Sequence, residues 1–177
     1  MKFEYLSKDN YNEILRIIKQ NIQINIYPRS FNLWETNHTN CYGYALAIDH
    51  SFNGFSQQAI MIPGNISNFD RYQLTHNKTF HNQYNFMDYI ESDLKTLGFD
   101  YKYYESGPIE EMNFLLGCYL YLPNNEFHFI RSDASGFSHK IGFHGKRERT
   151  NCIPKGCIEN VQHIATLTLA KKKETRH

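Results

Sequence analysis

Three side chains in this sequence have the types needed for nucleophilic chemistry: Cys41, His128 and His139. Asn40 precedes the cysteine and is a favoured N-cap residue, so we expect Cys41 to open a helix. The free N–H groups and the dipole at a helix start lower the pKa of a thiol and favour the thiolate, which is the nucleophile. A nearby imidazole can accept the thiol proton, and a further polar group can orient that imidazole. These residues therefore predict a cysteine nucleophile with a histidine base.

The two histidines lie in a segment, residues 126–142, whose pattern predicts a β-hairpin. Two aromatic-rich runs flank the sequence Asp-Ala-Ser-Gly, and both Asp and Gly are favoured in turns. We expect Arg131 to pair with Ser138 across this turn. Because side chains alternate across a strand, that register places both histidines on one face of the sheet.

The same register predicts the neighbours of each histidine and the side chains of the opposite face. His128 should lie opposite Ile141, and His139 opposite Ile130. Arg131 and Lys140 fall on the other face, where we expect them to be solvated or paired with carboxylates rather than to bind substrate.

Asp133 is most simply a turn residue, and it is the reserve candidate for orienting a histidine. Each main candidate also has an interpretation without chemistry. Cys41 could be a small buried hydrophobic residue, His128 a hydrogen-bonded core histidine, and His139 a surface or turn-stabilising residue. Thiol reactivity would separate a poised nucleophile from a buried structural cysteine.

The elements that would position these residues follow from periodicity. Helical spacing of apolar residues predicts helices before the sheet, and a period of two predicts strands after Gly98. An order of helices first and strands later indicates an α+β fold with an antiparallel sheet. The expected helices span residues 9–20, 41–49 and 86–97, the last with Asn85 as cap and Gly98 as terminator; the expected strands span 22–27, 99–104, 115–122 and 163–169, and 143–160 is expected to be loop. We expect a single domain over residues 1–170 and a solvated basic tail over 171–177.

Composition limits the possible partners. The chain has 177 residues, and its 19 Lys and Arg nearly balance its 18 Asp and Glu, so charge gives no reason to expect nucleic acid. No apolar run is long enough for a membrane span, and none follows the N-terminal lysine as in a signal peptide. We therefore expect a cytoplasmic protein, or one exported without a classical signal, with Cys118 buried in a core strand. Cys152 and Cys157 lie near His144 and His163, but their spacing is loose for zinc, and we predict no metal or other cofactor.

The layout of the candidate residues resembles the papain-like cysteine peptidases, in which a cysteine starts a helix and a histidine and a third polar residue follow on neighbouring strands. The short spacing between His128 and His139 is similar to that in the Cys-His-His site of NlpC-type cell-wall peptidases and amidases. Residues 39–48, with Asn-Cys-Tyr-Gly-Tyr-Ala, and residues 126–142 also resemble a set of uncharacterised bacterial proteins with the hairpin H-x-Y-R-x-D-x-D-G-x-W-S-H-K-x-G. This chain departs from that pattern in having Ile130 for Tyr, Phe137 for Trp and Ile141 where Pro is frequent.

The resemblance implies a papain-like fold, with N-terminal helices packed on an antiparallel sheet, and cysteine-dependent cleavage or transfer at an amide bond. Cys41 would be the nucleophile, His128 the general base, and His139 the residue that orients it. Asn40 and the N–H of Cys41 would stabilise the oxyanion. The substrate would be a peptide, a protein or peptidoglycan, and a peptidase, amidase, deamidase or transglutaminase would all fit. The alternative is a non-catalytic protein-binding module, an effector or inhibitor that keeps the fold.

Overall fold

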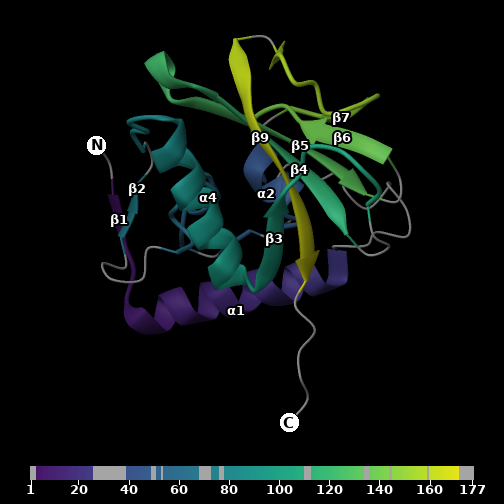
Figure 1. The fold of residues 1–177 in the computed structure, drawn as a ribbon. Helices are drawn as coiled ribbons and strands as arrows, with labels where there is room; N and C mark the ends of the chain where they lie inside the picture. The colour runs from purple at the N-terminus through teal and green to yellow at the C-terminus, as the bar shows by residue number, and fades with distance from the viewer. Residues whose placement is uncertain are drawn as a thin grey trace.

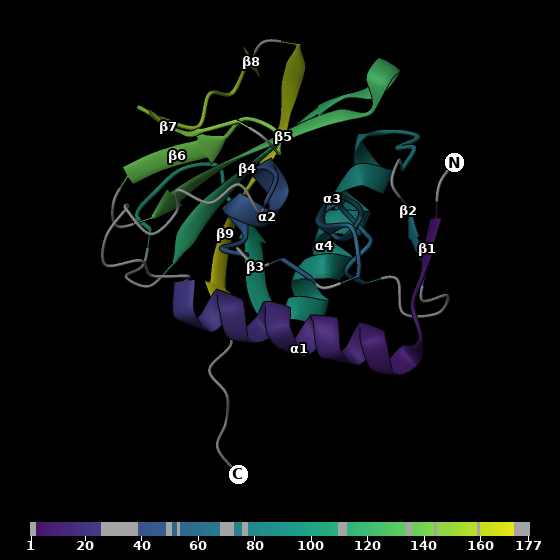
Figure 2. The same cartoon turned by 180° about the vertical axis from the view of Figure 1, so that it is seen from behind.

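A seven-stranded antiparallel sheet forms the centre of the molecule, and helices cover one of its faces (Figures 1 and 2). The computed structural model describes residues 3–25, 39–48, 51–52, 54–67, 73–75, 78–109, 113–133, 136–143, 145–158 and 160–171. The helical elements are α1 (Lys8–Asn25), α2 (Cys41–Ala45), α3 (Gln57–Ile60), α4 (Gln83–Leu97) and the 3-10 turn η2 (Leu122–Asn124). The strands are β1 (Phe3–Tyr5), β2 (Gln73–Thr75), β3 (Phe99–Tyr103), β4 (Phe114–Tyr121), β5 (Glu126–Asp133), β6 (Gly136–Lys140), β7 (Arg147–Thr150), β8 (Cys157–Ile158) and β9 (Val161–Lys171). The α+β class with an antiparallel sheet is therefore confirmed.

The strands of the main sheet follow the order β3-β9-β4-β5-β6-β7, and β8 pairs with β9. β4 lies inside the sheet between β5 and β9, and all of its residues except the last are buried. β1 and β2 form a separate two-stranded sheet. The predicted strands at 99–104, 115–122 and 163–169 correspond to β3, β4 and β9, with ends that shift by one to a few residues.

The first helix is longer than its sequence pattern predicted. α1 extends through Asn25, so residues 22–25 are helical, and the expectation of a strand beginning at residue 22 was wrong. Ile22 continues the buried stripe of Tyr11, Ile14 and Ile18 at helical spacing, which explains why the helix continues. Residues 26 and 27 lie outside the described residues.

The predicted helix at 86–97 is confirmed as α4. It begins earlier than expected because Asn82 caps it, with its side chain accepting a hydrogen bond of 2.8 Å from the N–H of Asn85. Gly98 ends it as predicted, with a φ of 77° that glycine adopts without strain. The helix buries Phe86, Ile90 and further apolar side chains against the sheet.

The helix opened by Cys41 is shorter than predicted. α2 ends at Ala45, and Ala47 takes a left-handed φ of 62° that breaks the helical path. The expected continuation to residue 49 was therefore wrong, and residue 49 itself lies outside the described residues. This short helix contacts β5 and β6, the two strands of the hairpin.

The hairpin register agrees with the sequence prediction at its turn and differs at its open end. Arg131 pairs with Ser138, and Ile130 pairs with His139. The expected pairing of His128 with Ile141 is not formed, since β6 ends at Lys140. The strand β5 thus has an unpaired side over its first residues.

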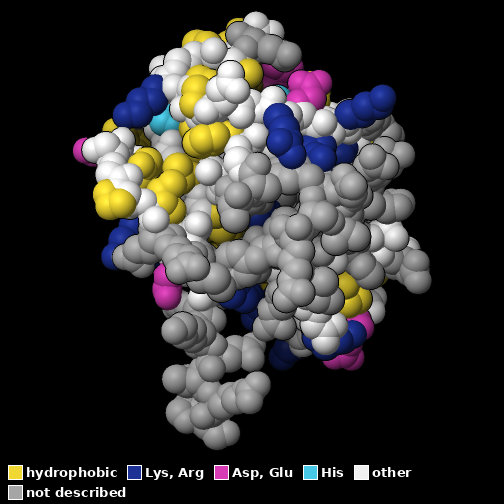
Figure 3. Space-filling view, turned by 90° about the vertical axis from the view of Figure 1, so that its right-hand side faces the viewer, with side chains coloured by type: hydrophobic (Ala, Val, Ile, Leu, Met, Phe, Trp, Pro, Cys, Tyr) yellow, Lys and Arg dark blue, Asp and Glu magenta, His cyan; other side chains and the backbone are white. Residues whose placement is uncertain are grey.

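The expectation of loop over 143–160 was wrong in part, because β7 and β8 lie within it. β7 has the sequence Arg-Glu-Arg-Thr and carries no apolar alternation that would mark a strand. Charged residues are common on edge strands because they discourage pairing with other chains. Figure 3 views the molecule from the side of β6 and β7 and shows several Lys and Arg side chains there.

Each face of the sheet has its own apolar cluster. The main core joins α1, α2 and α4 to one face through side chains such as Cys118 and Phe129. The second face carries a smaller cluster around Tyr119 and Ile130, covered by Ile153. None of the described helices is long and apolar enough to cross a membrane.

Lys171, the first residue of the predicted tail, belongs to β9, and its ammonium donates a hydrogen bond of 2.9 Å to the carbonyl of Leu97. Residues 172–177 lie outside the described residues.

Candidate active site

Cys41 opens α2, as the sequence predicted, and Asn40 caps the helix. The Oδ1 atom of Asn40 accepts hydrogen bonds from the N–H groups of Tyr42 at 3.1 Å and Gly43 at 3.0 Å. Its Nδ2 atom donates to the carbonyl of Met61 at 2.8 Å. The cap therefore fixes the start of α2 to the segment that follows α3.

The Cys41 thiol is buried, with 4% of the residue exposed, and donates a hydrogen bond of 3.7 Å to the carbonyl of Phe127. Burial raises its pKa to about 12. Hydrogen bonds from the backbone N–H groups of Phe129, Tyr42 and Cys41 itself act in the opposite direction, and so does the positive charge of Lys140. The thiol is therefore neutral at rest, although the N–H groups and Lys140 favour negative charge on sulfur.

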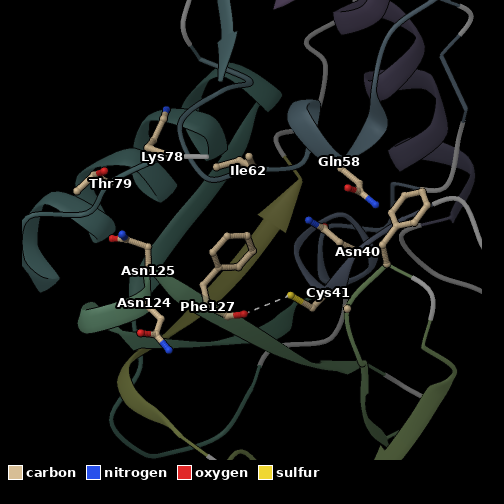
Figure 4. Close-up of a pocket in the computed structure, with 11 residues that line it drawn as sticks. Asn40, Cys41, Gln58, Ile62, Lys78, Thr79, Asn124, Asn125 and Phe127 are labelled. Carbon is tan, nitrogen blue, oxygen red and sulfur yellow. Dashed lines mark hydrogen bonds between the residues drawn. The ribbon is translucent and has the colours of Figure 1, made fainter. Parts of the chain in front are cut away.

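The thiol occupies the unpaired side of β5 (Figure 4). Its two β5 partners, the carbonyl of Phe127 and the N–H of Phe129, flank His128 in the strand. β6 pairs with β5 only as far as Ile130, so no strand of the described part of the chain pairs with this side of β5. Cys41 thus lies beside the main chain of His128.

The structure brings the two predicted histidines together. The Nε2 atom of His128 lies 2.8 Å from the Nδ1 atom of His139, and their ring centroids are 4.9 Å apart. Their predicted placement on one face of the sheet is thereby confirmed. Either nitrogen could be the donor, since the roles depend on the tautomer.

The structure does not bring the His128 ring into a hydrogen bond with Cys41 within the described part of the chain. Phe129 packs its ring 4.6 Å from that of Tyr42 in α2, so its face of β5 is the helix side. His128 alternates with Phe129 and points to the other side, where its ring centroid is 6.4 Å from that of Tyr119. The thiol is at the strand edge, and the imidazole leaves the same strand from the opposite face.

His128 is a neutral base in this environment. Burial lowers its pKa to about 4, and the neighbouring His139 lowers it further in the same direction. If His128 carries its proton on Nε2 and donates it to His139, the Nδ1 atom keeps a lone pair. No described residue hydrogen-bonds that Nδ1 atom, which is the ring nitrogen nearer the main chain.

A cleft of about 600 Å³ opens beside Cys41 (Figure 4). Its walls are rich in carboxamides, from Asn40, Gln58, Asn124 and Asn125. The rings of Phe127 and Phe143 and the side chain of Lys78 complete much of the lining. A polar chain could therefore reach the sulfur from solvent.

Sequence reasoning missed the role of the hairpin face opposite the histidines. Arg131 and Lys140 were expected to be solvated or paired with carboxylates, and the expectation of solvation was wrong, since they are 1% and 2% exposed. The Lys140 ammonium donates to the carbonyls of Gly142 at 3.1 Å and Phe143 at 2.5 Å. The signal was available, because a helix starting at Cys41 has to cover one face of the hairpin.

Ser138 lies on that same covered face. Its hydroxyl shares a hydrogen bond of 2.7 Å with the hydroxyl of Tyr44 in α2. This contact ties β6 to the helix that carries Cys41, and so restricts the distance between Cys41 and the hairpin.

The remaining expectations concern residues around the site. Cys118 is fully buried, as predicted, whereas Cys152 and Cys157 are exposed. Among the described residues, no group of three or more His, Cys, Asp or Glu could hold a metal ion, and His144 lies outside them. The backbone of Asp133 pairs with Gly136, but its side chain is not described, so its role stays a prediction.

Comparison with models of protein families, with curated proteins and with solved structures finds no match to this chain.

Proposed function

We propose that this chain is a cysteine-dependent hydrolase or acyl transferase that acts on an amide bond, with Cys41 as its nucleophile. The observation that carries the proposal is the setting of the Cys41 thiol. It stands at a capped helix start, among three backbone N–H groups and a buried ammonium, and it borders a solvent-accessible cleft. The N–H groups and the ammonium favour negative charge on sulfur and on a neighbouring oxyanion, whereas burial is the larger effect on the thiol and raises its pKa to about 12.

The arrangement also supports a papain-like architecture. The cysteine helix packs on the strand that carries His128, and the third residue, His139, is on the next strand of an antiparallel sheet. In this scheme His139 accepts the Nε2 proton of His128, which leaves Nδ1 available as the base.

The reaction would proceed by two acyl transfers. As sulfur attacks the carbonyl carbon, the thiol leaves the Phe127 carbonyl and its proton passes to His128 Nδ1. This transfer requires the His128 ring to turn toward the strand edge, because its ring lies beside Tyr119 on the face opposite α2. The N–H of Cys41 and the second Nδ2 hydrogen of Asn40 receive the oxyanion. Collapse of the intermediate breaks the C–N bond, the leaving amine takes the proton from His128, and a thioester remains on Cys41. Water or an acceptor amine then attacks the thioester and gives a proton to His128. The C–S bond breaks, and sulfur takes that proton from His128, which restores the thiol and the neutral imidazole.

One observation favours the second candidate, a non-catalytic binding module that keeps this fold. The thiol bonds to a main-chain carbonyl, and burial raises its pKa to about 12, which is also the condition of a structural cysteine. In that case the cleft would bind a partner without chemistry.

Turnover of p-nitrophenyl acetate separates the two, because this activated ester requires no knowledge of the natural acyl group. The purified protein should release p-nitrophenol catalytically, and acid quenching should trap an acetyl group on Cys41 that mass spectrometry locates. Cys41→Ala should abolish both, while the exposed control Cys152→Ala should retain them. Equal turnover by the Cys41→Ala variant, with circular dichroism showing both proteins folded, would leave the binding module as the function.

A further inference from the structure

We infer that the cleft beside Cys41 selects substrates that carry a carboxylate, and that Lys78 is the residue that binds it. This inference rests on the proposed function, since it names the substrate class of the same site. The carboxylate could belong to an acidic side chain or to a peptide C-terminus.

Lys78 is held in a specific position on the cleft wall. Its ammonium nitrogen lies 4.3 Å from the ring centroid of Tyr89, a residue of α4. The same nitrogen also lies close to Gly64, which has a φ of 88°: a Cβ atom added at Gly64 would come within 2.7 Å of it. The Tyr89 ring and Gly64 together therefore leave space for the ammonium that a larger residue at position 64 would fill.

The ammonium has no hydrogen-bond acceptor and no ion-pair partner among the described residues. The negative charge of Asp93 in α4 raises the pKa of Lys78. The Asp93 carboxylate already accepts hydrogen bonds from Tyr42, Gly64 and Ser67. Burial dominates and lowers the pKa of Lys78 to about 8. A half-buried cation with unused donors gains most from an anion that enters with the ligand.

The rest of the cleft fits the same class of ligand. Among the described residues that line it there is no Asp or Glu, and Lys78 is the only charged one. Figure 4 shows Lys78 and Cys41 on different sides of the cleft, with Phe127 between them. A substrate that joins them would place its reacting carbonyl at Cys41, cross the ring of Phe127 and end with its carboxylate at Lys78.

The test is equilibrium binding of matched peptides to the Cys41→Ala variant, which separates recognition from chemistry. The probes are acetyl-Gly-Gly-Glu-Gly-Gly-amide, its Gln and Lys counterparts, and acetyl-Gly-Gly-Gly with a free carboxylate or as the amide. Binding is followed by NMR shifts of the labelled protein, which resolve weak dissociation constants. The Glu/Gln pair tests a side-chain carboxylate, and the acid/amide pair tests a C-terminal one.

At least one carboxylate probe should bind about fivefold or more tightly than its neutral match, and the Lys peptide should bind most weakly. Lys78→Gln should remove the difference and Lys78→Arg should keep it, while the exposed control Lys102→Gln should leave it unchanged. The preference for carboxylate probes should fade as pH rises through about 8, because the Lys78 ammonium loses its proton there. The titratable groups that face Lys78 from α4 are Asp93 and Tyr89.

Equal binding of the charged and neutral probes at pH 7, or a preference that survives Lys78→Gln, would overturn the inference. Neither result would bear on the nucleophile, because p-nitrophenyl acetate turnover tests Cys41 without a carboxylate. Conversely, a carboxylate preference in a protein that shows no acyl transfer would assign the cleft to a binding module.

Discussion

The Nε2 atom of His128 lies 2.8 Å from the Nδ1 atom of His139, and the two rings are perpendicular, at 89°. The two residues are diagonal neighbours across β5 and β6, a relationship that long and aromatic side chains can bridge on one face of a sheet. Only one of the two nitrogens can donate at a time, so either His128 donates to His139 or the reverse, depending on the tautomer. Donation from His128 leaves its Nδ1 atom as a proton acceptor on the strand that also binds the Cys41 thiol.

We expect His139→Ala to lower p-nitrophenyl acetate turnover by about 10²-fold or more, because the base would lose the partner that holds its tautomer and orientation. His139→Gln, which offers an acceptor oxygen, should retain more activity than His139→Ala. The melting temperature of each variant reports whether the hairpin is intact.

Asp133→Ala is the matched comparison, since Asp133 belongs to the same hairpin beside the turn. This change should lower the melting temperature modestly and leave turnover nearly unchanged. An inactive Asp133→Ala together with an active His139→Ala would transfer the orienting role to Asp133.

The pH dependence of turnover should follow the low pKa of His128. A base acts only when it is deprotonated, so activity should be retained as pH falls below 6.5 and be lost only near pH 4. The reason is that burial and His139 both disfavour the imidazolium. The profile of kcat/KM for p-nitrophenyl acetate from pH 3.5 to 8 measures this pKa, and a midpoint near 6.5 would show that His128 is exposed or is not the base.

Asp93 should give a pH dependence of stability with a definite sign. Burial raises its pKa to about 6, above the value of 3.8 expected in the unfolded chain. The folded protein therefore binds the extra proton between those values, and the contribution of Asp93 to stability falls as pH rises from about 4 to 6. His128, whose pKa is lowered, contributes in the opposite direction over a similar range.

Comparison with the Asp93→Asn variant isolates the pH-dependent contribution of Asp93 to stability. The variant should be less stable overall, because an amide cannot accept all the hydrogen bonds that Tyr42, Gly64 and Ser67 donate. Its deficit in melting temperature relative to the native protein should shrink by several degrees as pH rises from 4 to 6. A deficit that grows over this interval would mean that the hydrogen bonds, rather than burial, control the pKa of Asp93.

Local chemistry made several parts of the fold predictable. The Asp-Ala-Ser-Gly turn predicted the hairpin register, because its position decides which residues pair. Asn40 and Gly98 predicted a helix start and a helix end, since each satisfies a local backbone requirement. Alternation then placed His128 and His139 on one face without any tertiary information.

Features set by long-range packing were not predictable in the same way. α2 ends early because Ala47 turns left-handed, and no residue type at that position signals it. β7 pairs along β6 with a charged sequence that has no apolar period. Lys140 is buried because α2 covers its face of the hairpin, a consequence that follows from the helix start at Cys41 but not from strand alternation alone.

The proposed function requires that Cys41 attacks an acyl carbon with His128 as its base. The rate of acetyl transfer from p-nitrophenyl acetate to Cys41, measured by quenched flow and mass spectrometry, reports on this step alone. His128→Ala should slow this single step by about 10²–10⁴-fold at pH 7 while Cys41 remains the acetylated residue and the protein remains folded. Acetylation of Cys41 at the native rate in the His128→Ala variant would contradict the account.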